Sequence, residues 1–167
     1  MTERVDFYVL SGSAPQQRLA FACRLTEKAY LKNMSVLIVS EDAAEARAVD
    51  ELLWTFNDRA FVPHEVCAAA GAGAPGADVP VRIAVDAPGV ATPGVATPGV
   101  ATPAGTNADL LVNLSGRLPA ALERFTRIAE IIDADPERRR LGRERFKAYR
   151  EQKLPLETHQ LNDGGEI

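Results

Sequence analysis

The first third of the chain alternates short apolar runs with stretches of helical spacing. Residues 5–10 are rich in β-branched and aromatic side chains and are followed by Ser-Gly-Ser, so a strand that ends in a turn is predicted. Residues 15–32 repeat apolar positions every three or four residues, which indicates an amphipathic helix. The continuous apolar run 35–39 is typical of a strand covered on both faces. A second helix, capped by Ser40 or Asp42, is predicted to run to about Trp54.

The remaining apolar runs continue this alternation. Further strands are predicted at residues 60–66, 80–85, 109–114 and 127–132, with an extension of the preceding helix as the alternative for the last of these runs. Pro63 places the first of them at a sheet edge, because proline cannot donate to a strand ladder. Residues 119–125 indicate a short helix, and Pro136 opens a longer one. The order favours an α/β fold in three layers, with a mostly parallel sheet flanked by helices.

The length of 167 residues suits one domain, which we expect to span residues 1–155. Within it, the unit Val-Ala-Thr-Pro-Gly begins at Val90, repeats at Val95 and returns imperfectly at Val100. Proline and glycine in each full copy are incompatible with a helix or a central strand. We therefore expect a flexible Gly/Pro-rich insert at about residues 86–107, and a polar C-terminal tail at residues 156–167.

Charge is concentrated near the C-terminus. Residues 136–153 hold eight basic and three acidic side chains, a local charge of +5 in a protein of net charge −4. Such a cluster indicates an anionic partner, either nucleic acid or an acidic peptide. The rest of the chain is acidic and the sequence pI is about 5.3, which argues against a protein that coats nucleic acid.

Signals for catalysis, cofactors or metals are weak. The turn after the first strand, SGSAPQQ, matches neither phosphate-binding glycine pattern. Cys23 and Cys67 have no metal-type spacing, and His64 and His159 lie far apart in the sequence. We therefore expect no catalytic site, no cofactor and no metal. The N-terminus does not resemble a signal peptide and no run of 18 apolar residues exists, so a cytoplasmic protein without a membrane segment is expected.

The basic cluster predicts a helix with one cationic stripe. With proline in the first turn, five side chains share a face: Arg139, Arg143, Phe146, Lys147 and Arg150. Single-stranded nucleic acid would place phosphates on the cations and a base on the ring. An acidic peptide ending in an apolar residue would place carboxylates on the arginines and its side chain beside the ring. A solvated basic face with the phenylalanine in the core is the third interpretation.

Two segments resemble the chi subunit of bacterial DNA polymerase III holoenzyme, an accessory of the clamp loader. They are LLWTFNDRAFVPHEV at residues 52–66 and RERFKAYR at residues 143–150, and they occur in the order found in that family. The likeness covers about residues 5–66 and 108–153. The pentapeptide insert and the tail depart from the family pattern.

This resemblance implies a nucleotide-binding-like fold without a nucleotide site and without intrinsic activity. It implies an adaptor that pairs 1:1 with the psi subunit and grips the acidic C-terminal tail of single-stranded DNA-binding protein, so that DNA is contacted only indirectly. The tail-binding residues of the family match Arg139, Arg143, Phe146 and Lys147, and the psi-facing residues match Trp54 and Phe61. Two alternatives remain: a module that binds single-stranded nucleic acid directly, and a nucleotide-binding α/β enzyme.

Overall fold

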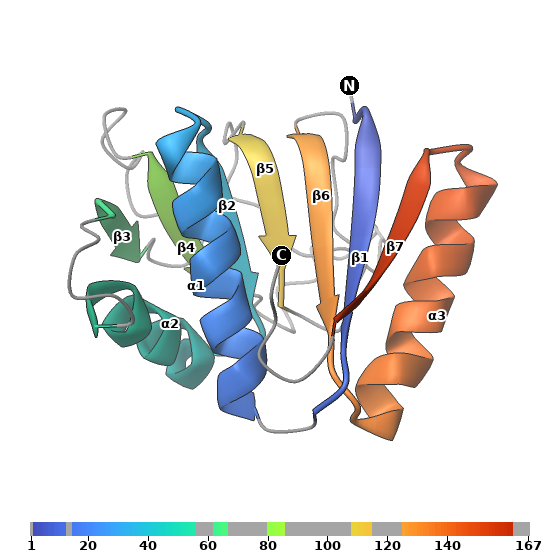
Figure 1. Cartoon of the computed structure of the whole chain (residues 1–167), viewed down its shortest axis with the longest axis horizontal. Coiled ribbons are helices and arrows are strands. Elements are labelled where there is room, and N and C mark those ends of the chain that lie inside the picture. The colour runs from blue at the N-terminus through green and yellow to red at the C-terminus, as the bar shows by residue number, and fades with distance from the viewer. Residues whose placement is uncertain are drawn as a thin grey trace, which may run out of the picture.

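The computed structural model describes residues 2–12, 15–55, 62–66, 80–85, 108–114 and 125–161. Within these ranges strands and helices alternate along most of the chain (Figure 1). The elements are β1 (Arg4–Leu10), α1 (Pro15–Leu31), β2 (Val36–Ser40), α2 (Ala43–Thr55), β3 (His64–Val66), β4 (Val81–Val85), β5 (Ala108–Asn113), β6 (Phe125–Ile132), α3 (Pro136–Glu151) and β7 (Leu156–Leu161).

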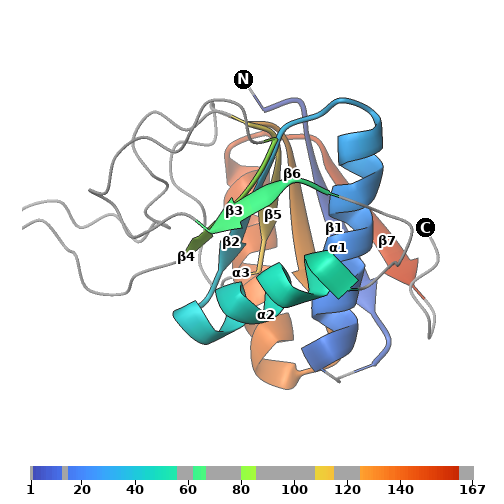
Figure 2. The same ribbon diagram turned by 90° about the vertical axis from the view of Figure 1, so that its left-hand side faces the viewer.

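The strands form one sheet in the order β3-β4-β2-β5-β6-β1-β7, and every neighbouring pair is parallel. Helices α1 and α2 lie on one face of this sheet and α3 lies on the other (Figure 2). The prediction of a three-layer α/β fold with a mostly parallel sheet is confirmed. Parallel strands need crossover connections, which is why helices cover both faces.

Each face of the sheet has its own hydrophobic core. Ile38 of β2 and Tyr8 of β1 belong to the core under α1 and α2, whereas Leu37 and Phe7 belong to the core on the face that carries α3. Successive residues of a strand point to opposite faces, so a central strand with a core on each side must be apolar throughout. This explains the uninterrupted apolar run in β2, whose five residues are all buried.

The two edges of the sheet differ. Strand β3 has three residues, follows Pro63 directly and pairs with β4, which agrees with the predicted edge position although the strand is shorter than expected. Strand β7 has six residues and pairs in parallel with β1 over its whole length, from Val5↔Leu156 to Leu10↔Leu161. In Figure 1 these strands lie at opposite ends of the sheet.

The prediction that residues 156–167 form a polar tail is wrong for its first half. Strand β7 is part of the sheet, so the folded domain extends at least to Leu161. Its sequence, LETHQL, is polar because an edge strand has one neighbour and is largely exposed. Its two leucines nevertheless pack on the two cores, Leu156 on the α3 side and Leu161 on the α1 side.

Several other sequence predictions fall wholly or partly outside the described residues. These are the insert at residues 86–107, Phe61, Cys67, and all but the last residue of the short helix predicted at 119–125. That last residue, Phe125, begins strand β6 and is fully buried, so the helix does not extend to it.

Candidate binding groove between helix α3 and strand β7

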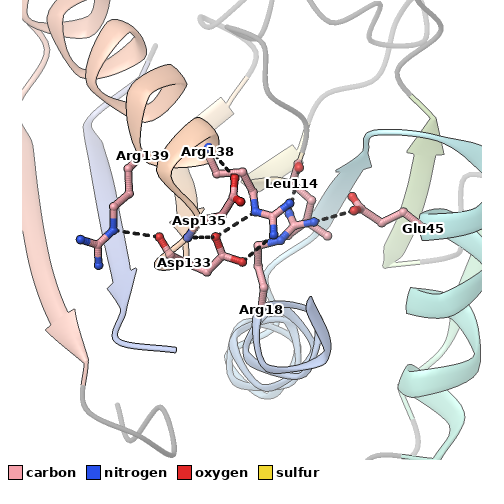
Figure 3. Close-up of polar contacts among 7 residues, drawn as sticks. All are labelled: Arg18, Glu45, Leu114, Asp133, Asp135, Arg138 and Arg139. Atoms are coloured by element: carbon pink, nitrogen blue, oxygen red, sulfur yellow. Dashed lines mark hydrogen bonds and ion pairs between the residues drawn. The ribbon is translucent and has the colours of Figure 1, made fainter. Parts of the chain in front are cut away.

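Helix α3 begins at a set of short polar contacts. Asp135 is its N-cap and accepts a hydrogen bond of 3.0 Å from the Arg138 amide, and Pro136 occupies the first turn, where its missing N–H costs nothing. Arg138 donates from Nε and Nη2 to the two carboxylate oxygens of Asp133, each at 2.8 Å (Figure 3). Arg139 donates from Nε to the Asp133 carbonyl at 3.1 Å. These contacts fix the direction in which α3 leaves the sheet.

Asp133 is held as a carboxylate. Burial alone would raise its pKa, but the hydrogen bonds from Arg138 and from the Asp135 amide, with the positive charge of Arg138, bring that pKa below its ordinary value. Nearby, Arg18 of α1 donates to the Leu114 carbonyl at 2.9 Å and to Glu45 of α2 at 2.6 Å (Figure 3). Arg18 and Arg138 are therefore both used inside the fold.

The inward face of α3 rests on a buried polar cluster around Glu130 of β6. Arg145 Nε donates to Glu130 at 3.0 Å, the Tyr149 hydroxyl donates to it at 2.6 Å, and the Asn113 amide donates to it at 2.9 Å. Burial raises the pKa of Glu130, and these partners oppose that shift. Burial and the Glu130 charge raise the pKa of Tyr149 well above its ordinary value. Arg145 and Tyr149 therefore lie on the face of α3 that packs against the sheet.

The outer face of α3 keeps the remaining cations. Arg140 is neutralised on the helix surface by Glu137 at 2.6 Å and Glu144 at 2.9 Å. In contrast, Arg143 and Lys147 are exposed, and neither forms an ion pair with any residue that the structure describes. The helix thus uses some of its arginines for folding and leaves a separate set open to an external anion.

A pocket of about 240 Å³ lies beside this open set. Its lining comes from β1, β6, α3 and β7, and comprises Phe7, Val9, Ile132, Arg139, Gly142, Arg143, Phe146 and Thr158. The strand residues Phe7, Val9 and Ile132 provide its apolar floor, and α3 contributes Phe146 and two arginines. Cavities of about 150 Å³ hold a benzene ring, so this pocket has room for a phenyl side chain.

Two residues of α3 shape this pocket. Phe146 packs edge-on against Phe7, with ring centroids 5.2 Å apart, and remains partly exposed. Gly142 lets the helix lie directly on β6, because a Cβ at this position would overlap Ile132 Cδ1. A larger residue would push the Ile132 side chain out of its place in the pocket floor.

The structure brings together three of the four residues predicted to bind the tail. Arg139, Arg143 and Phe146 line the pocket, whereas Lys147 lies on the exposed surface of the same helix without lining it. Phe146 contributes both to the core and to the pocket wall, so the interpretation of a phenylalanine buried only in the core is too simple.

Sequence reasoning missed the floor of the pocket. Phe7 and Val9 are two residues apart in β1 and therefore share a face, but the pattern does not say that α3 covers that face. Thr158 could not be found, because β7 was expected to be a tail.

A second candidate surface lies at the opposite edge of the sheet. Trp54, in the last turn of α2, is 50% exposed, and its ring centroid lies 4.5 Å from that of His64 in β3. The His64 ring contacts the Asp50 carboxylate at 3.0 Å and the Val62 carbonyl at 2.7 Å. The predicted partner of Trp54 at this surface, Phe61, lies outside the described residues.

Two carboxylates and a histidine gather where β1 pairs with β7. Asp6, Glu157 and His159 present ligand atoms within 4.8 Å of one another. However, Arg127 pairs with Asp6 at 2.8 Å, and Arg4 pairs with Asp6 at 3.1 Å and with Glu157 at 2.9 Å. Guanidinium groups already supply the positive charge that an ion would bring.

Among the helices that the structure describes, none combines the length and the apolar character needed to cross a membrane.

These features define an α/β protein with a parallel sheet and a basic helix, whose cationic groove has an apolar floor. The family model "DNA polymerase III chi subunit, HolC" matches residues 1–157. The chain belongs to this family, as its two sequence motifs predicted. Members of the family are accessory subunits of DNA polymerase III, so the protein is a subunit of the DNA replication machinery.

Individual relatives agree with this assignment. The chain is 35% identical to DNA polymerase III subunit chi of Pseudomonas aeruginosa, with 95% of this chain and 96% of that protein covered. It is 27% identical to the Escherichia coli subunit chi, with 93% and 97% covered. The crystal structure of T4 UvsW superposes with a TM-score of 0.60 at 10% identity, covering 96% of this chain and 42% of that one, which shows likeness of fold alone.

Proposed function

We propose that this protein is a non-catalytic adaptor of the clamp loader. In this proposal the Trp54 surface binds the psi subunit, and the groove between α3 and β7 binds the acidic C-terminal tail of single-stranded DNA-binding protein. One observation carries the tail-binding half: Arg139 and Arg143 stand beside an apolar pocket, whereas Arg138, Arg140 and Arg145 are engaged by carboxylates of the protein itself.

The groove matches the chemistry of such a tail. The terminal carboxylate and neighbouring aspartates of the tail would pair with Arg139, Arg143 and Lys147, and guanidinium groups can hold carboxylates by two parallel hydrogen bonds. The terminal phenylalanine ring would enter the pocket beside Phe146. Exposed ion pairs contribute only about 0–1 kcal/mol each, so a single tail binds weakly. Many tails on one coated DNA strand then supply avidity.

Replacing Arg143 by alanine tests the groove, with Arg140→Ala as the matched control. Both arginines are exposed residues of the same helix, so both variants lose one positive charge, but Arg140 is already paired with Glu137 and Glu144. For an acidic peptide ending in phenylalanine, calorimetric titration should show about fivefold weaker binding to Arg143→Ala, the loss that corresponds to one exposed ion pair of about 1 kcal/mol. Arg140→Ala should bind within about twofold of the wild type. Equal affinities for the two variants would contradict the assignment.

The psi-binding half rests on Trp54, a large aromatic residue left half exposed at the sheet edge. Tryptophan is a frequent anchor of protein interfaces. We expect Trp54→Ala to abolish co-purification with psi and to leave tail binding unchanged. Leu31, at the end of α1, is 70% exposed and provides an apolar control. If Leu31→Ala lost psi to the same extent, the Trp54 surface would not be the specific contact.

A further inference from the structure

The two edges of the sheet are protected to different degrees. Strand β3 has only three residues, and so short an edge strand discourages pairing with another chain. Strand β7 is six residues long, contains no proline and keeps a regular register with β1. In the part of the chain that the structure describes, β7 is the last strand of the sheet. Its outer side is therefore a ready template for an additional strand.

The pattern of hydrogen bonds between β1 and β7 identifies which residues of β7 direct their backbone groups outward. The Val5 amide donates to the Pro155 carbonyl at 2.9 Å, and Val5 is in register with Leu156. In a parallel pair this arrangement directs the backbone groups of Glu157 and His159 toward β1. The N–H and C=O groups of the alternate residues, Leu156, Thr158 and Gln160, point away from the sheet.

This open edge borders the pocket. Thr158 is in register with Phe7, and both side chains line the pocket on the α3 face of the sheet. The groove therefore has the cationic side of α3 on one side and, on the other, backbone groups of β7 that no described strand pairs with. A peptide lying in it would meet carboxylate-binding arginines and backbone hydrogen-bonding groups at the same time.

We propose that the acidic segment binds as an extended strand paired with the outer edge of β7, with its backbone bonded at Thr158. This inference rests on the proposed function, because it assumes that an acidic tail occupies the groove. Pairing with a sheet edge supplies affinity through main-chain hydrogen bonds, and adjacent pockets select side chains. The residue opposite Thr158 would point to the α3 face, where the phenylalanine pocket lies.

Amide hydrogen exchange of the full-length protein tests this directly. The probe is a synthetic peptide of consecutive aspartates ending in phenylalanine, added to saturation. The Thr158 amide should exchange at least about fivefold more slowly with the peptide than without it, whereas the Glu157 and His159 amides, already bonded to β1, should change little. If the Thr158 amide exchanges equally fast in the two states while the peptide is bound, edge pairing is wrong.

Substitution provides the second test, by comparing Thr158→Pro with Thr158→Val. Both lose the hydroxyl, but only proline removes the outward N–H, and proline is tolerated where the N–H of an edge strand faces solvent. Thr158→Pro should bind the peptide about tenfold more weakly than Thr158→Val, because one backbone hydrogen bond is lost and its acceptor is left unpaired. Urea unfolding of both variants shows whether β7 has remained in the sheet.

The outcomes separate this inference from the function on which it rests. Equal affinities of the two Thr158 variants, with binding still lost in Arg143→Ala, would overturn edge pairing and leave the groove intact. Failure of the wild type to bind the peptide would overturn both proposals. If Thr158→Pro unfolds, the exchange rate of the wild-type Thr158 amide decides.

Discussion

At the scale of single residues, Arg143 and Arg145 show how α3 separates folding from binding. They are two positions apart, about 200° around the helix, so they lie on nearly opposite sides. Arg145 is 94% buried and bound to Glu130, whereas Arg143 is exposed and borders the pocket. Removing one partner of a buried ion pair leaves an uncompensated charge, which is far more costly than removing an exposed charge.

We therefore predict that Arg145→Ala lowers the free energy of unfolding by about 3–5 kcal/mol. Arg143→Ala should change it by no more than about 0.5 kcal/mol. Urea denaturation followed by circular dichroism measures both values. A similar loss in the two variants would mean that Glu130 does not depend on Arg145 for its compensation.

At the scale of elements, much of the architecture follows from the pattern of apolar residues. The buried strands β2 and β5 can be predicted from the sequence, because a sheet covered on both faces needs apolar residues at consecutive positions. The cationic stripe of α3 also follows from helical spacing, once proline is placed in the first turn. Trp54 was correctly expected at the end of its helix.

Strand β7 shows where that reasoning ends. An edge strand is stabilised mainly by backbone hydrogen bonds to its neighbour. These bonds do not require particular side chains, so the sequence pattern does not reveal them. The polar residues Glu157 and His159 mask the packing of Leu156 and Leu161 on the two cores. The pocket could not be predicted either. Its walls come from four elements, and they lie next to one another only because of the strand order, which includes β7.

At the scale of the whole molecule, the decisive property is the uneven charge. The chain carries −4 overall, yet its basic helix presents cations at one groove that form no ion pair with any described residue. A nucleic-acid strand is long and would extend beyond the groove onto the acidic remainder of the surface. A short acidic tail can be confined to the groove, so the field of the molecule favours the tail over an oligonucleotide.

We predict that the protein binds a short acidic peptide more tightly than a single-stranded oligonucleotide at equal, low ionic strength. Raising the salt concentration should weaken peptide binding, because Debye screening shortens the range of the exposed charges to about 8–10 Å. Fluorescence anisotropy with the two labelled probes over a series of salt concentrations measures both effects. Tighter binding of the oligonucleotide would favour direct recognition of single-stranded nucleic acid.

The positions of β3 and β7 at opposite ends of one sheet have a consequence for assembly. Six inter-strand spacings of about 4.8 Å put the two edges roughly 29 Å apart. With psi at one edge and the tail at the other, neither ligand would touch or shield its counterpart. The two association constants would then be independent. The sheet would connect the two ligands without any conformational change of the protein. Release of the tail would leave the polymerase assembly intact and ready to take hold of the next one.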